Sequence, residues 1–130
     1  MTRSKEDYLK VMLGLSDGEG VRSSDIANAL GITRASVSRM TEILKDEGYV
    51  KKEKYGAVAL TEAGRSAAVN VKRRYDLLKA FLGSVLGLEA AAAAGDACRI
   101  EHIISSETTD KIGRRLEKLS KFKLKPEDAK

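Results

Sequence analysis

The sequence predicts a mainly α-helical fold, on the basis of three observations. Residues 23–39 contain two short helical segments joined at Gly31, the pattern of a helix-turn-helix. Residues 49–54 and 57–60 alternate between apolar and polar side chains, as the strands of a small β-hairpin wing do. A long apolar helix begins after Thr61. We therefore expect an N-terminal winged helix-turn-helix followed by an all-helical dimerisation domain. These domains are placed in residues 1–65 and 66–120, with a Lys-rich tail in residues 121–130.

The composition is that of a folded basic protein. Hydrophobic residues make up 42% of the 130 residues, which is enough for a packed core. Lys and Arg number 24 against 19 Asp and Glu, and the net charge of +5 favours an anionic partner without identifying it. The single Cys excludes an internal disulfide, and together with the lack of a signal peptide it predicts a cytoplasmic protein. Since no apolar run approaches the ~20 residues that span a membrane, we expect no membrane association.

The first expected element is an amphipathic helix over residues 4–15, capped by Ser4. Its expected buried stripe consists of Tyr8, Val11, Met12 and Leu15. Asp7 lies beside this stripe, and from this segment alone we interpret it as a solvated carboxylate that stabilises the positive helix end. Residues 16–20 are expected to form a loop.

The helix-turn-helix follows directly. Ser23 or Ser24 is expected to cap its first helix, and Gly31 to end that helix in the left-handed conformation. We expect Ile32 to pack inward and Thr33 to cap the second helix. The expected buried positions of the second helix are Val37, Met40, Ile43 and Leu44.

The other face of the second helix is small, polar or basic, so it can enter a major groove and offer donors to phosphates and bases. The candidate DNA-contacting residues are Thr33, Arg34, Ala35, Ser36, Ser38 and Arg39. Arg39 is the best candidate to read a base, because Arg can bind guanine bidentately. The alternative is an ordinary helical hairpin with a solvated face.

Three lysines, Lys51, Lys52 and Lys54, give the expected wing a positive charge suited to backbone phosphates. An equally plausible use of such lysines is protection of a solvated edge strand. Their position directly after a candidate recognition helix favours phosphate contact.

The C-terminal half is expected to be helical throughout. A helix from Thr61 to about Leu86 carries more apolar surface than a small winged helix needs, so it can pair with a second subunit or with the later helices. We expect Gly87 to break it and a short helix to follow over residues 88–94, stopped by Gly95. Beyond these lie a segment capped by Asp96, a last helix over residues 107–119 capped by Ser105 or Ser106, and a frayed tail.

Cys98, Glu101 and His102 are spaced i, i+3 and i+4, so one helical face would present all three. A thiolate, a carboxylate and an imidazole within one turn can form half of a transition-metal site. The alternative is a small buried Cys98 beside a surface pair of Glu101 and His102. An enzyme is not expected, because no oxyanion-stabilising loop or third orienting group accompanies the Cys and His.

Four motifs give the chain a family resemblance that covers about residues 4–119. They are EDYL at 6–9, SDIANALGITRASVSRM at 24–40, EKYGAVALTEAG at 53–64 and DACRIEH at 96–102. Together they resemble the DtxR/MntR family of metal-dependent transcriptional repressors. The length is similar to that of the shorter, manganese-type branch without an SH3-like domain, whereas DACRIEH is close to the iron-sensing version of the motif.

The resemblance implies a metal site of four ligands, Asp7, Cys98, Glu101 and His102, and so reverses the interpretation of Asp7 as a solvated carboxylate. At other positions where family members have further ligands, this chain has Lys10, Tyr75 and Lys79. The resemblance therefore implies one ion per subunit. Because a thiolate suits Fe(II) better than Mn(II), we expect Fe(II) first and Mn(II) second.

The function implied is that of a homodimer that binds a palindromic double-stranded operator when a divalent cation links its two domains, and that represses metal-uptake genes. No small organic substrate is implied. One alternative is a winged-helix regulator that senses an organic ligand or oxidant through Cys98 without metal. A further alternative is a protein-interaction module without DNA affinity.

Overall fold

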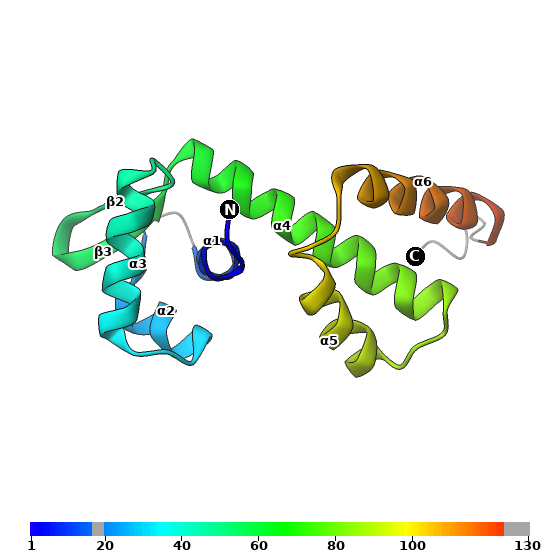
Figure 1. Ribbon diagram of the computed structural model, residues 1–130, viewed down its shortest axis with the longest axis horizontal. Helices are drawn as coiled ribbons and strands as arrows, with labels where there is room; N and C mark the ends of the chain where they lie inside the picture. Colours follow the sequence, from blue (N-terminus) through cyan, green and yellow to red (C-terminus); the bar gives the residue numbers. More distant parts are fainter. Residues whose placement is uncertain (17–19, 124–130) are drawn as a thin grey trace. The chain divides into compact units, whose positions relative to one another are not determined.

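The computed structural model describes residues 1–16 and 20–123, and side chains up to residue 120. The chain divides into two units, Met1–Lys72 and Arg73–Lys130, and each is described by itself. Most of the expected loop at 16–20 and residues 124–130 of the expected frayed tail lie outside the described residues. The expected fold class is confirmed: the chain is mostly helical, with a small antiparallel sheet after a helix-turn-helix (Figure 1).

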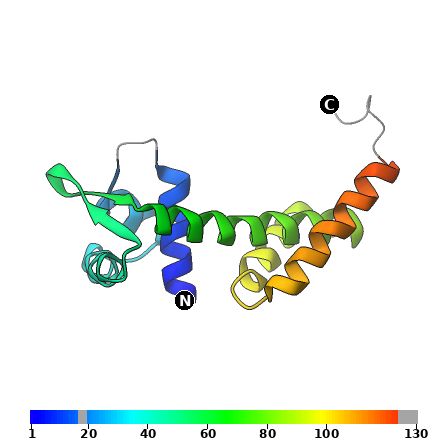
Figure 2. The ribbon, with the colours of Figure 1, turned by 90° about the horizontal axis from the view of Figure 1, so that it is seen from above.

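The first unit contains three helices, a three-stranded sheet and the start of a fourth helix. In chain order these are α1 (Arg3–Leu15), β1 (Val21–Arg22), α2 (Ser23–Leu30), α3 (Arg34–Asp46), β2 (Val50–Lys52), η1 (Lys54–Gly56), β3 (Ala57–Leu60) and α4 (Glu62–Ala80). Figure 2 shows the β2–β3 hairpin extending away from the helices of this unit.

The sheet has a strand that was not expected from the sequence. Its order is β1-β3-β2, all antiparallel, with Val21 opposite Val58 and Val50 opposite Leu60. β1 is only two residues long, too short to show an alternating pattern, so its pairing with β3 decides its conformation. Since β1 runs directly into α2, Arg22 is the N-cap and neither Ser23 nor Ser24 caps the helix as expected.

The core of the first unit joins all of these elements. Its buried side chains are Tyr8, Leu9, Met12, Val21, Ile26, Ala27, Val37, Leu44, Val50, Val58 and Ala68. In α1 the expected buried stripe is partly wrong. Leu15 was expected to be buried but is 41% exposed, whereas Leu9, which was not expected there, is completely buried. The cap also differs from the expected Ser4: Thr2 Oγ1 accepts a hydrogen bond from Lys5 N at 3.3 Å.

Helix α3 is buried along a slightly different face from the one expected. Val37 and Leu44 are fully buried, but Thr41 takes the third buried position. Ile43 and Ile32 are 45% and 43% exposed, so the expectation that both pack inward is wrong. A polar residue is buried here because its hydroxyl finds partners inside the core.

The turn and cap residues agree with the sequence pattern at three positions. Gly31 ends α2 with φ 68° and ψ 32°, the left-handed conformation. Thr33 Oγ1 accepts a hydrogen bond from Ser36 N at 3.1 Å, and Thr61 Oγ1 accepts one from Gly64 N at 3.1 Å. Gly64 has a further role, since a Cβ there would lie 1.9 Å from the Tyr49 carbonyl oxygen.

The second unit contains the end of α4, a π-helical turn η2 (Phe81–Val85), α5 (Ala90–Ile100) and α6 (Ser106–Lys123). The expected break at Gly95 is absent from the structure, because strong helix formers on both sides keep α5 continuous through it. Ser105 caps α6, its Oγ accepting a hydrogen bond from Thr108 N at 3.1 Å. Leu78, Ala93 and Ala97 are buried here. None of the helices in the described residues is long and apolar enough to cross a membrane.

Candidate nucleic-acid interface and metal-ligating residues

The N-terminal part of α3 presents a polar surface opposite its buried face. Of the six candidate contact residues, all are exposed except Ser36, which is half-buried. Ser36 Oγ accepts hydrogen bonds from Thr33 Oγ1 at 3.0 Å and from a guanidinium nitrogen of Arg39 at 3.3 Å. The first turn of α3 has no acidic residue, so its positive end remains favourable to phosphate. This surface has the shape and charge of a helix that reads DNA.

The wing lysines are exposed, and two of them make ion pairs. Lys51 Nζ lies 3.6 Å from Glu53 Oε1, and Lys52 Nζ donates a hydrogen bond to Glu42 Oε1. Lys54 opens the turn of the hairpin, where Tyr55 has a φ of 61° and is fully exposed. To contact a DNA phosphate, Lys51 must therefore leave the carboxylate of Glu53, and Lys52 must leave that of Glu42.

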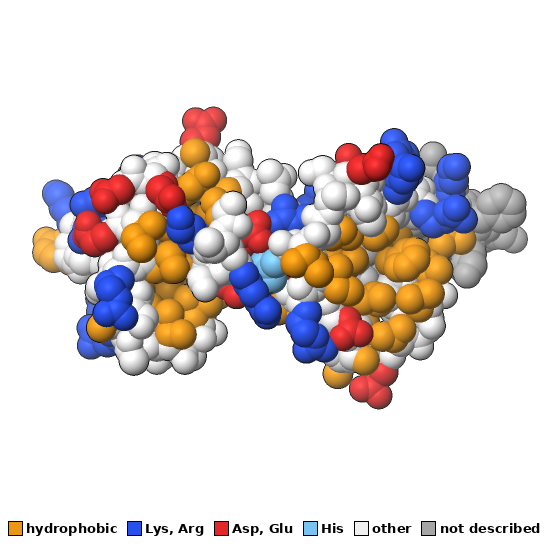
Figure 3. Space-filling model, viewed as in Figure 1, with side chains coloured by type: hydrophobic (Ala, Val, Ile, Leu, Met, Phe, Trp, Pro, Cys, Tyr) orange, Lys and Arg blue, Asp and Glu red, His pale blue; other side chains and the backbone are white. Residues whose placement is uncertain are grey.

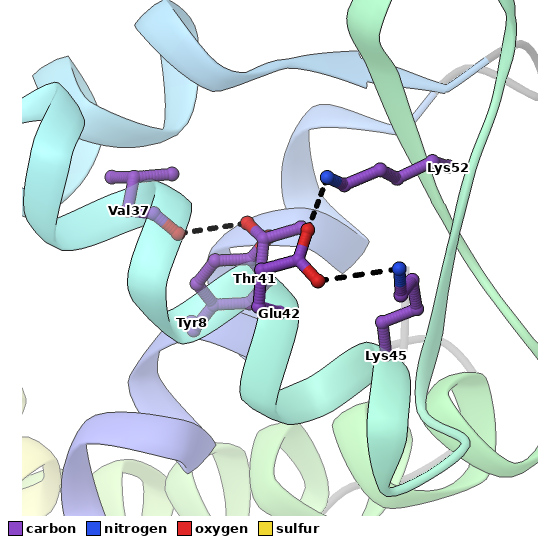
Figure 4. Close-up of polar contacts among 6 residues, drawn as sticks. All are labelled: Tyr8, Val37, Thr41, Glu42, Lys45 and Lys52. Atoms are coloured by element: carbon purple, nitrogen blue, oxygen red, sulfur yellow. Dashed lines mark hydrogen bonds and ion pairs between the residues drawn. The ribbon is translucent and has the colours of Figure 1, made fainter.

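Glu42, on α3, is a further residue near the proposed DNA surface, and it was not predicted from the sequence. Its carboxylate forms ion pairs with Lys52 of the wing and, at 3.2 Å, with Lys45 of its own helix (Figure 4). The hydrogen bonds from Lys52 and Lys45 lower the pKa of Glu42. The i, i+3 spacing of Glu42 and Lys45 signals their pair in the sequence. The Lys52 pair joins α3 to β2 and depends on the tertiary fold.

Asp7 lies on α1 with its side chain 34% exposed, and its Oδ2 is 3.9 Å from Arg3 Nε. The pair is spaced i, i+4 on the helix. Asp7 directly precedes the buried Tyr8, so it lies at the edge of the face that packs into the core of the first unit.

Cys98, Glu101 and His102 lie at the C-terminal end of α5. Cys98 is partly buried within the helix. Glu101 is the C-cap, remains helical with φ −55° and ψ −26°, and is completely buried. His102 Nε2 lies 3.2 Å from Glu101 Oε1, and the His102 side chain is 3% exposed. The structure therefore brings the carboxylate and the imidazole together in a buried place.

The helix closes immediately after these residues. Ile103 N and Ile104 N both donate to the Ile100 carbonyl oxygen, at 3.0 and 3.1 Å, so His102 lies in the closing turn. Arg74 Nε, on α4, donates to the Glu101 carbonyl oxygen at 2.8 Å. Arg74 thus fixes this turn within the second unit. Its role had no signal in the sequence, because it acts on a backbone atom 27 residues away.

The donor chemistry of this turn fits a divalent transition metal. Thiolate, carboxylate and imidazole are the side chains that bind Fe(II), Co(II), Ni(II) and Zn(II). A buried carboxylate needs cationic or hydrogen-bonding partners, and the His102 imidazole at 3.2 Å is one partner of Glu101. Glu101 and His102 together have the chemistry to bind a cation, and Cys98 offers a softer donor one helical turn earlier.

The second unit also has an apolar surface. Figure 3 shows hydrophobic side chains gathered on one face of this unit. A groove of about 440 Å³ lies between η2 and α6, lined by Phe81, Val85, Thr108, Lys111, Ile112, Arg115 and Leu119. Near it, Leu86 is 58% exposed. A surface of this kind is typical of a helical interface between subunits.

Two protein-family models match nearly the whole chain. The family described as iron dependent repressor, N-terminal DNA binding domain, matches residues 1–58. The family described as iron dependent repressor, metal binding and dimerisation domain, matches residues 61–126. The boundary between the two matches falls at the start of α4.

Individual relatives agree with this match. An uncharacterised HTH-type transcriptional regulator of Methanocaldococcus jannaschii is 32% identical over 120 residues, which are 91% of this chain and 96% of the relative. A hypothetical protein from Sulfolobus solfataricus has a similar crystal structure, with a TM-score of 0.73, 25% identity and 91% of each chain covered. A manganese-dependent transcriptional repressor in complex with manganese has a TM-score of 0.77 at 30% identity, over 87% of this chain and 52% of that one.

Proposed function

Because this chain belongs to the iron-dependent repressor family, the DtxR/MntR metal-dependent transcriptional regulators, we propose that it represses metal-uptake genes when a divalent cation activates it. Its family domains are a DNA-binding domain and a metal-binding and dimerisation domain, which support DNA and a second copy of the chain as partners. A family of transcriptional regulators does not point to catalysis. We propose a cytoplasmic location, because a transcriptional regulator must reach the operator DNA that it binds.

The metal ligands we propose are Asp7, Cys98, Glu101 and His102. The observation that carries this assignment is the buried Glu101 carboxylate, 3.2 Å from the imidazole of the only His in the chain. A divalent ion bound here would attract this carboxylate strongly, because the electrostatic interaction is little screened in a buried place. Asp7 of the first unit would complete the set. The ion would then restrict the first unit, which carries the recognition helix.

We propose one ion per subunit. At the positions where family members have further ligands, this chain has Lys10, Tyr75 and Lys79. A lysine ammonium repels a cation instead of binding it. Fe(II) is the first candidate because Cys98 offers a soft thiolate ligand, and Mn(II) is the second. The similar repressor in complex with manganese supports keeping Mn(II) in the test.

For DNA, we propose that a twofold dimer places two α3 helices in successive major grooves of a palindromic operator. Thr33, Arg34, Ala35, Ser36, Ser38 and Arg39 would lie in the groove. Arg39 would read a base, and Lys51, Lys52 and Lys54 would contact phosphates. A sensor of an organic ligand or oxidant is less favoured, because the family of the C-terminal half is one of metal-binding domains.

Replacement of His102 tests the metal site. A duplex is first selected by the wild-type protein from a random-sequence pool with Fe(II) under anaerobic conditions or with Mn(II). Affinity for this duplex is then titrated with each metal for wild type, His102→Ala and the exposed control Ser106→Ala, which lies outside the groove lining. We expect metal to raise the affinity of wild type and Ser106→Ala roughly 5- to 150-fold, and that of His102→Ala very little.

A full metal response in His102→Ala would show that the proposed ligands are wrong. Equal binding of wild type after chelation would instead support a regulator that works without metal. Loss of binding on mild oxidation, absent in Cys98→Ser, would then identify Cys98 as the sensor.

A further inference from the structure

A buried chain of hydrogen bonds links α1 to the recognition helix. Tyr8 OH lies 2.6 Å from Thr41 Oγ1. Thr41 Oγ1 donates to the Val37 carbonyl oxygen at 2.8 Å (Figure 4). Tyr8 is completely buried and Thr41 is 3% exposed. These polar groups lie within the hydrophobic core of the first unit.

The donor and acceptor in each of these hydrogen bonds follow from the single hydrogen that each hydroxyl carries. A threonine hydroxyl has one hydrogen, and here Thr41 gives it to Val37. The phenol of Tyr8 must therefore be the donor to Thr41. Each bond polarises the next, and removal of the Thr41 hydroxyl takes this hydrogen-bond partner away from the buried Tyr8 phenol. The contact is thus directional and depends on the relative position of α1 and α3.

This series of hydrogen bonds begins next to the proposed metal ligand and ends in the recognition helix. Tyr8 directly follows Asp7, the proposed metal ligand on α1. Thr41 and Val37 form the buried face of α3, and Ser38 and Arg39 lie between them on the exposed face. A second link acts farther along α3, where Lys5 Nζ lies 2.8 Å from Glu47 Oε2. α1 is therefore attached to α3 both in the core and at the C-terminal end of α3.

We propose that Tyr8 and Thr41 are positioning residues that transmit the restraint of a metal ion on Asp7 to the recognition helix. This inference rests on the proposed metal-dependent function and names the contact that couples its two sites. An ion that holds α1 still can favour one position of α3 only through groups that differ between the two positions. A directional buried hydrogen bond is such a group, whereas apolar contacts tolerate small displacements.

The test uses Tyr8→Phe and Thr41→Val, which remove a hydroxyl and keep most of the shape. Mn(II) is the probe, and the DNA is a duplex selected by the wild-type protein in Mn(II). The quantity measured is the ratio of duplex affinities with and without Mn(II). We expect each variant to reduce this ratio about fivefold, the equivalent of one net hydrogen bond, while Mn(II) affinity without DNA stays within about twofold.

Three controls separate coupling from general loss of stability. Thr41→Ser keeps the hydroxyl and should restore the wild-type ratio. Tyr49→Phe removes the hydroxyl of a half-buried tyrosine in the same unit and should keep the ratio. By reciprocity, bound DNA must raise Mn(II) affinity by the same factor, so both measurements should fall together in Tyr8→Phe.

A measurement on the wild type covers the case in which the variants fail to fold. Amide hydrogen exchange in α3 should slow when Mn(II) is added, and unchanged exchange there would contradict the proposal. A folded Tyr8→Phe protein with the full wild-type ratio would overturn the coupling role alone. If the wild type responds neither to Mn(II) nor to Fe(II) under anaerobic conditions, the proposed function fails and the coupling role falls with it. If Asp7→Ala keeps the full metal effect, the coupling role fails while metal-dependent DNA binding stands.

Discussion

At the residue scale, the chain buries polar side chains at positions where apolar side chains would cost less free energy. Glu101 is completely buried beside His102, and the Tyr8–Thr41 pair is buried in the core of the first unit. A buried polar group is tolerated only with partners, so each position implies a use for them. For Glu101 we propose a cation, and for Tyr8 a directional link to α3.

The buried phenol makes stability depend on pH at the alkaline end. Burial raises the pKa of Tyr8, because the charged phenolate would lose its hydration in the core. Because the folded pKa exceeds that of the unfolded chain, about 10, this contribution is complete below pH ~10 and is lost as pH rises through the folded pKa. The free energy of unfolding of wild type should therefore fall between pH 9 and 11 (about 1.4 kcal/mol for each pKa unit) by more than that of Tyr8→Phe. Urea unfolding at several pH values checks this, and parallel losses in the two proteins would contradict it.

At the scale of elements, an ion pair joins the wing to α3, and a backbone hydrogen bond joins the residue before α4 to the residue before β2. Lys52 of β2 binds Glu42 of α3, and the Thr61 N–H donates to the Tyr49 carbonyl oxygen at 3.0 Å. The first contact is electrostatic and exposed, while the second depends on close approach at Gly64. They should respond to substitution in different ways.

Glu42→Gln tests the electrostatic contact. The change frees Lys45 and Lys52 and removes a negative charge near the proposed DNA surface. Affinity for a random duplex should rise, and the slope of log affinity against log salt should steepen by up to about 2, since each added phosphate contact contributes about 0.9. Asp46→Asn makes the same charge change on the same helix and should alter the slope less. An unchanged slope in Glu42→Gln would mean that these lysines do not reach phosphate.

Gly64→Ala tests the close approach. A Cβ at Gly64 would lie 1.9 Å from the Tyr49 carbonyl oxygen, so the backbone must move, at a cost of about 1–3 kcal/mol in the free energy of unfolding. Gly113→Ala in α6 is the matched control, because its Cβ would lie 3.5 Å from the Leu77 side chain. That helical substitution should be neutral or stabilising by up to about 1 kcal/mol. Thermal and urea unfolding of both variants measures the difference.

At the scale of the whole molecule, the function that we propose uses two copies of the chain. One recognition helix offers few base contacts, and a second copy would double them over the symmetric operator that we propose. The apolar groove between η2 and α6 belongs to the part of the chain that matches a dimerisation domain. We expect this groove to lie in the subunit interface.

Val85→Glu tests that expectation. Val85 is 40% exposed and lines the groove, so a charge there would be buried on association and should weaken the dimer. Val69→Glu places the same charge at a valine that is 47% exposed on α4 of the first unit, and it should leave dimerisation unchanged. Sedimentation velocity over a range of concentrations measures both. Equal dimerisation of Val85→Glu and wild type would place the interface elsewhere.

Features that depend on neighbours along the chain could be predicted from the sequence. Gly31 and the threonine caps follow from local backbone chemistry, and the order of helices and wing follows from periodicity and spacing. The donor set at the end of α5 was also visible, because one helical turn brings it together. These features need no information about distant residues.

Contacts between side chains that are distant in the sequence depend on how the elements pack. This packing buried Leu9 where the sequence predicted Leu15, added β1 to the sheet, and brought Thr41 to Tyr8 and Lys52 to Glu42. The periodicity of one helix defines a face only to within about one residue. The partner element selects the residues of that face that are buried, and that partner lies elsewhere in the chain.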